Sequence, residues 1–246
     1  MDFGLWPALD LKNGQFWRLT EVLRPTIVNV EFVRSKKLLF RATVFAGSVG
    51  LHTASKPGAF SLSLDSRFDN NDDLGLLRWI EQKQTDYDQE ITMLTRKVFQ
   101  DATDYPEAFE ALNNTKVIGP AYVIVSGVSA GQGAVITKGK TDLGDGETID
   151  VWSLADEIRQ NNTYFLVETN YDRTGPAPPS DDRRDPAVLC LKELTPAKYN
   201  FNGLYNVLEA TPNLNRLTTF TALMHAKTGR YETYREFCVG LRCPLE

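Results

Sequence analysis

Long apolar segments are absent from this sequence, and no stretch is apolar over the roughly 20 residues that a membrane-spanning helix needs. The opening MDFGLWPALD carries an acid at position 2 and lacks the basic and apolar regions of a secretory signal peptide. A surplus of positive charge is also absent, since 27 Lys and Arg face 32 Asp and Glu. The net charge of -5 argues against nucleic acid as a partner.

Histidine and cysteine are scarce, which limits metal-based and nucleophilic chemistry. The two histidines and three cysteines show no zinc-binding spacing, so we expect neither a metal nor a cofactor. His52 and His225 lie in apolar, strand-like contexts that favour structural roles. No G-x-S-x-G motif precedes a helix, so the sequence offers no support for a serine hydrolase of that type.

The three cysteines leave the redox compartment open. Cys238 and Cys243 stand five residues apart in CVGLRC and could close a small disulfide loop. Cys190 is then left over, and an odd cysteine in a secreted protein suggests pairing with another chain. Three reduced cysteines in a cytosolic protein fit the same count. Two NNT triplets make Asn113 and Asn161 candidate glycosylation sites, although such triplets also occur by chance.

Apolar periodicity predicts blocks of strands and helices. Strands are expected as a hairpin over 25–47, then at 58–68, 121–127, 133–139, 148–154 and 163–170, and as a closing hairpin over 216–236. Helices are expected at 74–82, 89–102, 103–114 and 201–210. This order lacks a regular alternation of strand and helix, so it indicates an α+β fold with mostly antiparallel strands.

The stretch TNYDRTGPAPPSDDRR, residues 169–184, combines an amide, several acids and two final arginines around a Pro-rich loop. One interpretation is a solvated loop with surface ion pairs, which contribute little to stability. The other places Asn170 and one arginine around a reacting group. Composition does not decide between these two interpretations.

Six short motifs occur in a fixed order along the chain. They are MDFG (1–4), KPGAFSLSLDSRF (56–68), GPAYVIVSG (119–127), GAVITKG (133–139), VETNYDR (167–173) and DDRR (181–184). Together they resemble the acid ceramidase family over nearly the whole chain. The resemblance implies one N-terminal nucleophile hydrolase domain over 1–246, an α+β, αββα sandwich of mostly antiparallel sheets that lacks its first strand.

The resemblance also implies the chemistry. Members hydrolyse the amide of ceramide or another N-acyl lipid through a cysteine acyl-enzyme. By motif, Asp2, Asn170 and Arg183 match the family's catalytic acid, asparagine and arginine. At Ser66, with Asp65 beside it, the family has a glutamate. If that glutamate acts through its side chain, this part of the site is altered, whereas nothing is lost if its backbone does the work.

The family's nucleophilic cysteine lies upstream of the methionine that is Met1 here, and no cysteine of this chain takes its place. Residues 1–246 are therefore expected to be inactive alone. Two interpretations follow: a truncated form of a working lysosomal amidase, which we favour, or a non-catalytic homologue that keeps a lipid-binding groove. N-acylethanolamine acid amidase is an alternative within the family. Leu5 and Trp6 could line a lipid groove or simply pack.

The family resemblance further implies partners. An α-subunit from the same precursor is expected, joined through Cys190, while Cys238 and Cys243 pair with each other. A lipid-transfer activator protein is a possible second partner. The implied location is the lysosome, reached by the secretory route with a signal peptide that is not in this chain.

Overall fold

The computed structural model describes residues 16–67, 90–117, 119–139, 147–179, 181–194 and 198–237. Within these ranges a seven-stranded sheet runs in the order β1 to β7, and β8 pairs with β9 in a second sheet. Every pairing is antiparallel. The strands are β1 Ile27–Arg34, β2 Lys37–Phe45, β3 Thr53–Lys56, β4 Phe60–Ser66, β5 Ala121–Ser126, β6 Gly133–Lys138, β7 Thr148–Ser153, β8 Phe220–His225 and β9 Arg230–Arg235.

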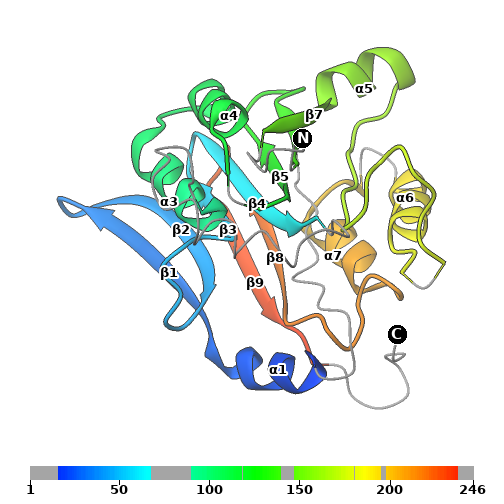
Figure 1. The fold of residues 1–246 in the computed structure, drawn as a ribbon, viewed down its shortest axis with the longest axis horizontal. Coiled ribbons are helices and arrows are strands. Elements are labelled where there is room, and N and C mark those ends of the chain that lie inside the picture. The colour runs from blue at the N-terminus through cyan, green and yellow to red at the C-terminus, as the bar shows by residue number, and fades with distance from the viewer. Residues whose placement is uncertain are drawn as a thin grey trace, which may run out of the picture.

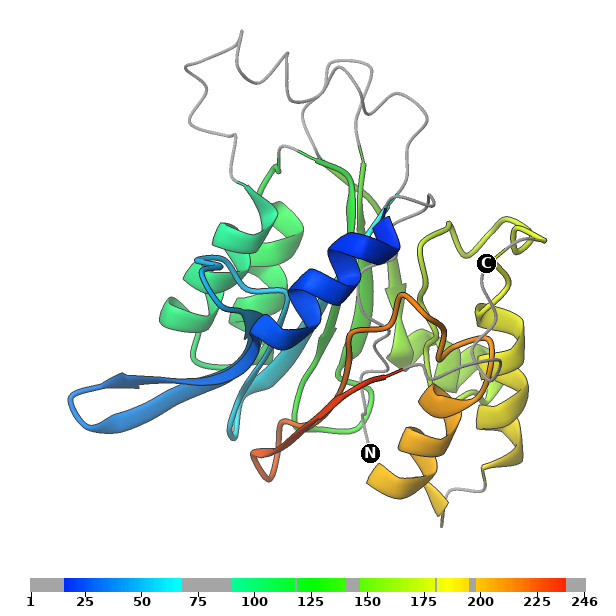
Figure 2. The same cartoon turned by 90° about the horizontal axis from the view of Figure 1, so that it is seen from below.

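Helices cover both outer sides of the paired sheets. Figure 2 shows α3 and α4 against one face of the large sheet, and α6 and α7 beyond β8 and β9 on the other side. The α-helices are α1 Phe16–Leu23, α3 Ile91–Asp101, α4 Tyr105–Asn114, α5 Leu154–Asn161, α6 Arg184–Glu193 and α7 Phe201–Glu209. Figure 1 shows the same order of layers, which confirms the predicted α+β, αββα arrangement. No helix in the described ranges is long and apolar enough to cross a membrane.

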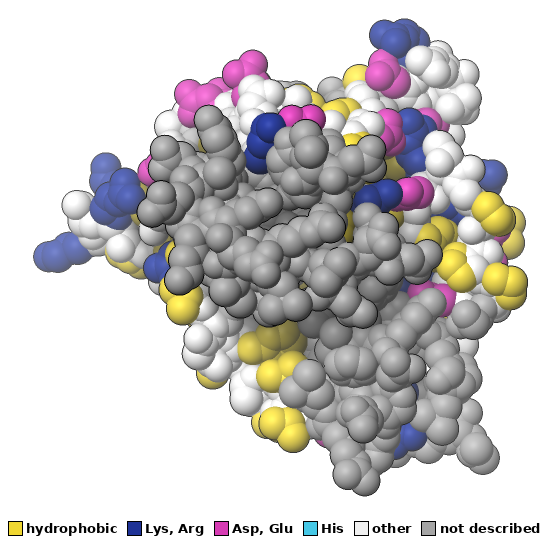
Figure 3. Space-filling view, in the orientation of Figure 1, with side chains coloured by type: hydrophobic (Ala, Val, Ile, Leu, Met, Phe, Trp, Pro, Cys, Tyr) yellow, Lys and Arg dark blue, Asp and Glu magenta, His cyan; other side chains and the backbone are white. Residues whose placement is uncertain are grey.

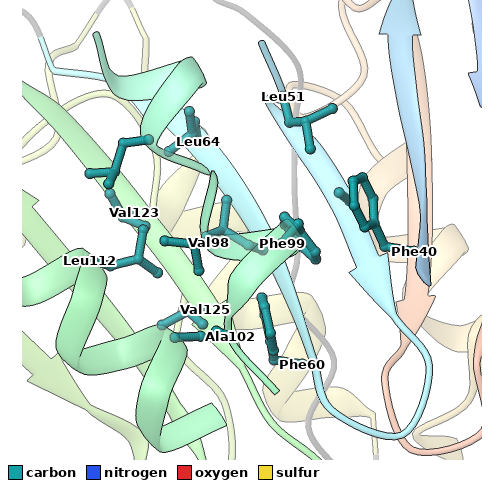
Figure 4. Close-up of a cluster of buried hydrophobic side chains, with 14 of the residues drawn as sticks. Phe40, Leu51, Phe60, Leu64, Val98, Phe99, Ala102, Leu112, Val123 and Val125 are labelled. Carbon is teal, nitrogen blue, oxygen red and sulfur yellow. The ribbon is translucent and has the colours of Figure 1, made fainter. Parts of the chain in front are cut away.

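The outer face of the large sheet is apolar and packs on α3 and α4. Leu62 and Leu64 of β4 stand opposite Val125 and Val123 of β5 and point to this side. Phe99 of α3 packs against this face of the sheet (Figure 4). Its ring lies 4.7 Å from that of Phe60 and 5.2 Å from that of Phe40.

The inner face of the same strands is polar. The polar residues that alternate with these leucines and valines are Ser61, Ser63 and Asp65 on β4 and Tyr122 and Ser126 on β5. Alternate residues of a strand point to opposite faces, so this polar set lies between the two sheets. All of β8, which borders this space, is buried except for a half-buried His225.

The helices predicted over 89–102 and 103–114 are confirmed as α3 and α4, and each begins two residues later than predicted. Glu90 caps α3 by accepting hydrogen bonds from the N–H groups of Thr92 and Met93. Asp104 accepts from the Glu107 N–H at the start of α4, and Pro106 occupies the first turn, where its missing N–H costs nothing. The predicted hairpins and α7 are also confirmed.

The predicted strand over 163–170 is wrong. Residues 162–169 belong to no helix and no sheet in the described ranges, and Asn162 at their start is left-handed, with φ 50°. Apolar alternation predicts an extended, half-buried chain, whereas a strand also needs a neighbour that supplies ladder hydrogen bonds. Four elements were not predicted, namely α1, β3, α5 and α6. The predicted helix over 74–82 lies outside the described residues.

Arg24 joins the two ends of the described chain. Its side chain is 2% exposed, and its guanidinium donates to the carbonyl oxygens of Thr218 (2.6 Å), Arg216 (3.4 Å) and Glu236. We expect Arg24→Met to lower the free energy of unfolding by about 2–4 kcal/mol, because buried carbonyl groups lose their donor. Chemical denaturation of Arg24→Met, with the exposed Arg159→Met as control, checks this. Equal stability of the two variants would contradict it.

Candidate active site

Asn170 directly follows residues 162–169 and connects three parts of the chain. Its side chain is buried, at 4% exposed. The amide nitrogen donates to Asp65 Oδ1 at 3.3 Å and to the Ser66 carbonyl oxygen at 2.9 Å, both at the end of β4. The amide oxygen accepts from Arg183 Nη2 at 2.7 Å. Asn170 therefore fixes the end of β4 relative to the start of α6.

Arg183 is held by a buried carboxylate as well as by Asn170. Its Nε and Nη2 atoms donate to the two oxygens of Asp181 at 2.7 and 3.1 Å. Both side chains are almost fully buried, at 3% and 1% exposed. A two-point contact of this kind fixes the plane of the guanidinium. Removing one partner would leave the other charge buried without compensation.

Arg184 points to a different place, although it is adjacent in sequence. Its Nη2 donates to the Gly175 carbonyl oxygen at 2.9 Å, and its guanidinium lies 4.9 Å from the centre of the Tyr171 ring. It also contacts Asp185, at 3.3 Å. The sequence-based expectation of pairing with neighbouring acids is therefore incomplete, because Arg184 mainly fastens the Pro-rich loop, residues 171–179.

Asp172 ties the Pro-rich loop to the large sheet. Arg67 donates to its two carboxylate oxygens at 2.8 and 2.9 Å, and the Tyr122 hydroxyl donates at 2.7 Å. The hydrogen bonds from Arg67 hold the pKa of Asp172 below its ordinary value. Burial, followed by the bond to Asp172, raises the pKa of Tyr122 well above its ordinary value, so its hydroxyl keeps its proton.

A second ion pair fixes the same loop further along. Arg173 donates to both oxygens of Asp150 on β7 at 2.7 and 3.1 Å, and it lies 5.5 Å from the centre of the Trp152 ring. The pair is about one-third exposed, so its own contribution to stability is small. Its effect is positional: the Pro-rich loop is attached to β7 as well as to β5.

Glu168 is a site residue that the sequence reasoning missed. It is 6% exposed, and the Thr169 N–H donates to its Oε1 at 2.9 Å. The pKa of Glu168 is raised to about 8, mainly by burial and in part by the negative charge of Asp172. The hydrogen bond from the Thr169 N–H and the positive charges of Arg184 and Arg173 act in the opposite direction. A glutamate directly after the apolar run YFLV was the available signal.

The remaining predicted site residues fall into two groups. Asp65 is buried and contacts Asn170, and Ser66 meets Asn170 through its backbone carbonyl, so both lie at the candidate site. Five predicted residues lie outside the described part of the chain: Asp2, Leu5, Trp6, Cys238 and Cys243.

The predicted position of the nucleophile, upstream of Met1, also lies outside the described residues, as does Met1 itself. The described chain begins at Phe16, the first residue of α1. His225 shares a hydrogen bond with Thr228 beyond β8, and His52 lies directly before β3. The position of the nucleophile relative to Asn170 therefore stays a prediction.

The two candidate glycosylation sites differ in exposure. Asn161 is exposed at the end of α5. Asn113 is half-buried at the end of α4, and its backbone carbonyl accepts from Lys138 Nζ at 2.9 Å. Asn161 is therefore the more exposed of the two, and its amide nitrogen donates to Glu157 Oε2 at 2.7 Å.

The polar groups that meet at Asn170 are amide, carboxyl and guanidinium groups. No group of three or more His, Cys, Asp or Glu side chains in the described ranges could hold a metal ion. Figure 3 shows Lys and Arg gathered at the projecting tip of the β1–β2 hairpin, with both signs of charge scattered elsewhere on the described part of that face.

Comparison with known proteins identifies relatives of the whole chain. No protein-family model matches it. It is 42% identical to acid ceramidase of Heterocephalus glaber, 41% to that of Homo sapiens and 39% to that of Mus musculus, each over 239 residues. The chain is a homologue of the acid ceramidases. These matches cover 97% of this chain and 58% of each relative.

A solved structure supports the same assignment. The Caenorhabditis elegans N-acylethanolamine-hydrolyzing acid amidase ortholog superposes with a TM-score of 0.75 at 28% sequence identity. The alignment covers 89% of this acid ceramidase homologue and 90% of the worm chain. The likeness confirms the predicted N-terminal nucleophile hydrolase fold.

The raised pKa of Glu168 predicts a pH-dependent stability. The folded protein keeps this proton up to about pH 8, whereas the unfolded chain loses it near the ordinary value of 4.5. This contribution is complete below that ordinary value and is lost as the pH rises through 8. We expect Glu168→Gln to remove a decline on the order of 3–5 kcal/mol in the free energy of unfolding.

Urea denaturation at several pH values between these limits measures that decline. The exposed Glu110→Gln on α4 is the matched control and is expected to keep the wild-type slope. A Glu168→Gln variant whose stability falls with pH as steeply as the wild type would contradict the assignment.

Proposed function

We propose that this chain is the larger part of a lysosomal amidase that cleaves the amide bond of ceramide to sphingosine and a fatty acid. The observation that carries the proposal is the buried contact among Asn170, Arg183 and Asp65 in a homologue of the acid ceramidases. Buried amide, carboxylate and guanidinium groups are costly to desolvate, and such groups gather at functional sites. The chain spans 58% of its curated relatives, so the activity of the whole protein is part of the proposal.

The proposed chemistry proceeds through an acyl-enzyme. A cysteine thiolate attacks the amide carbonyl, the amine leaves with a proton, and water then cleaves the thioester. The tetrahedral intermediate carries a negative oxygen that needs hydrogen-bond donors. Asn170 is the proposed donor. Its longer bond, 3.3 Å to Asp65, is the one that a substrate oxygen would replace.

Asp2 is proposed as the acid that positions the nucleophile's α-amine, as the family resemblance suggests. The nucleophile itself is proposed to lie upstream of Met1, outside residues 1–246. Cys190 is a poor candidate, because it lies on α6 and packs against the apolar cluster shared by α6 and α7. In the described ranges β8 pairs only with β9, and residues 162–169 pair with no strand. These unpaired backbone segments support the presence of a further strand, which would pair with them. One domain over 1–246 remains our proposal.

A second substrate class has its own support. The worm structure that this fold resembles is named for hydrolysis of N-acylethanolamines. Both substrate classes contain an N-acyl amide and differ in the amine that leaves. Comparing kcat/KM of the full-length protein for a short-chain ceramide and for an N-acylethanolamine of equal acyl length decides between the two substrate classes. If the protein turns over neither substrate, the non-catalytic, lipid-binding alternative is favoured.

The family resemblance suggests the proposed partners. We propose an α-subunit from the same precursor, a lysosomal location and a glycan at Asn161, whose side chain is exposed. A lipid-transfer activator is proposed to deliver the insoluble substrate.

The central network predicts an order of mutational effects in the full-length protein. Asn170→Ala is expected to lower kcat by on the order of 10²- to 10³-fold, because one donor to the oxyanion is lost. Arg183→Ala is expected to be at least as damaging, since it leaves Asp181 buried without its partner. Arg184→Ala, which loosens only the Pro-rich loop, is expected to reduce turnover less. Measuring kcat and KM on a short-chain ceramide tests this order.

Each variant needs a native thermal transition before its kinetics are compared. Asn202→Ala, at an exposed position on α7, is the matched control for Asn170→Ala. Near-normal turnover by Asn170→Ala would refute its role as a donor. A larger loss of kcat from Arg184→Ala than from Arg183→Ala would assign the active-site role to Arg184 instead.

Cys190 provides a test of the two-chain proposal. It is a half-buried free cysteine in this chain. We expect peptide mapping of the full-length secreted protein without reductant to find Cys190 joined to a separate α-chain and Cys238 joined to Cys243. Recovery of Cys190 as a free thiol would refute that connection.

A further inference from the structure

Glu168 is a buried acid that the chemistry proposed above does not use. A carboxyl group removed from water is costly unless it is neutral or well paired. Within the described ranges its hydrogen bond comes from the adjacent Thr169 N–H, to one of its two oxygens. The other oxygen makes no hydrogen bond there, which leaves capacity for a ligand.

Glu168 lies two residues before Asn170, and both side chains are buried. Phe165 and Val167, in the same segment, pack into the apolar cluster formed by α6 and α7. The charge of Glu168 acts on Tyr122 of β5, which stands opposite Asp65, the residue that Asn170 contacts, and this places Glu168 on the side of the large sheet. The contact of Asn170 with Asp65 and Ser66 on β4 confirms that direction for its own side chain.

Charged and titratable groups from three elements surround Glu168. Tyr122 of β5 stands opposite Asp65 in the sheet, and its pKa is raised in part by the charge of Glu168. Asp172 and Arg173 approach from the Pro-rich loop, and Arg184 from the start of α6. Asp172 is already paired with Arg67, Arg173 with Asp150, and Arg184 with loop carbonyls. None of these cations makes a hydrogen bond to Glu168, so its carboxyl group is not neutralised by an ion pair.

We infer that Glu168 is a further active-site residue, which as a neutral carboxylic acid donates a hydrogen bond to the carbonyl oxygen of the amide being cleaved, beside Asn170. This inference rests on the proposed amidase function. A protonated carboxyl has one O–H donor, and a buried acid can keep that proton at neutral pH and stabilise an oxyanion. Two adjacent donors on one face, an amide and an acid, form the proposed oxyanion site.

Two substitutions separate donation from packing. Glu168→Gln keeps the shape and an N–H donor, and is expected to retain kcat within about threefold at about pH 5. Glu168→Leu removes the donor and is expected to lower kcat by about 10- to 100-fold, with KM changed less than kcat. The exposed Glu110→Gln is the control and is expected to match the wild type. The assay uses the full-length protein and a short-chain ceramide.

The pH profile supplies a readout that a structural role would not produce. Wild-type kcat is expected to fall as the pH rises through about 8, where Glu168 ionises, and Glu168→Gln is expected to lack that step. A kcat for Glu168→Leu within threefold of the wild type at acid pH would overturn the inference. So would an unchanged alkaline step in Glu168→Gln, provided that both variants melt as the wild type does.

An infrared measurement keeps this test separate from the proposed function. The wild type near neutral pH is expected to show the absorption of a protonated carboxyl group that Glu168→Gln lacks. If the wild type cleaves no N-acyl lipid, the proposed function fails, and with it the substrate role of Glu168, whatever the infrared result. If the wild type is active and the protonated band is missing, only the inference about Glu168 fails.

Discussion

The buried ion pair between Arg183 and Asp181 is the interaction on which the site depends. It fixes the guanidinium at the start of α6, and that guanidinium holds the oxygen of Asn170 at 2.7 Å. The nitrogen of Asn170 then reaches Asp65 and the Ser66 carbonyl at the end of β4. One chain of contacts thus joins the outer helical layer to the central sheet. A buried pair is stable only when its remaining groups are hydrogen-bonded, which Asn170 helps to provide.

The two faces of the large sheet explain why the chemistry lies between the layers. The outer face carries leucine, valine and phenylalanine side chains and packs on α3 and α4. The inner face carries serine, aspartate and tyrosine side chains, which support polar contacts. Glu168 and Asn170 approach this polar face from the opposite layer. Their burial there accounts for the raised pKa of Glu168, and the nearby ion pairs of the Pro-rich loop limit movement around it.

Much of the fold could be predicted from local sequence. Alternating apolar residues locate β4, the helical spacing of apolar residues locates α3, and Pro106 in the first turn locates α4. The segment before Asn170 was predicted as a strand over 163–170 because its apolar residues indicate burial. A strand also requires a paired neighbour, which this segment lacks in the described ranges. The sequence also singled out Asn170 and Arg183, yet their contact, 13 residues apart, depends on a loop that turns the chain back. Glu168 was missed because its effect depends on neighbours from β5, the loop and α6.

The most direct test of the account is a crystal structure of the full-length protein with an acyl group trapped on its nucleophile. The account predicts that the carbonyl oxygen of the bound acyl group lies within hydrogen-bond reach, about 3 Å, of Asn170 Nδ2. It also predicts that Arg183 keeps its two bonds to Asp181 in that complex. A carbonyl oxygen more than about 6 Å from Asn170, well beyond any direct hydrogen bond, would contradict the account.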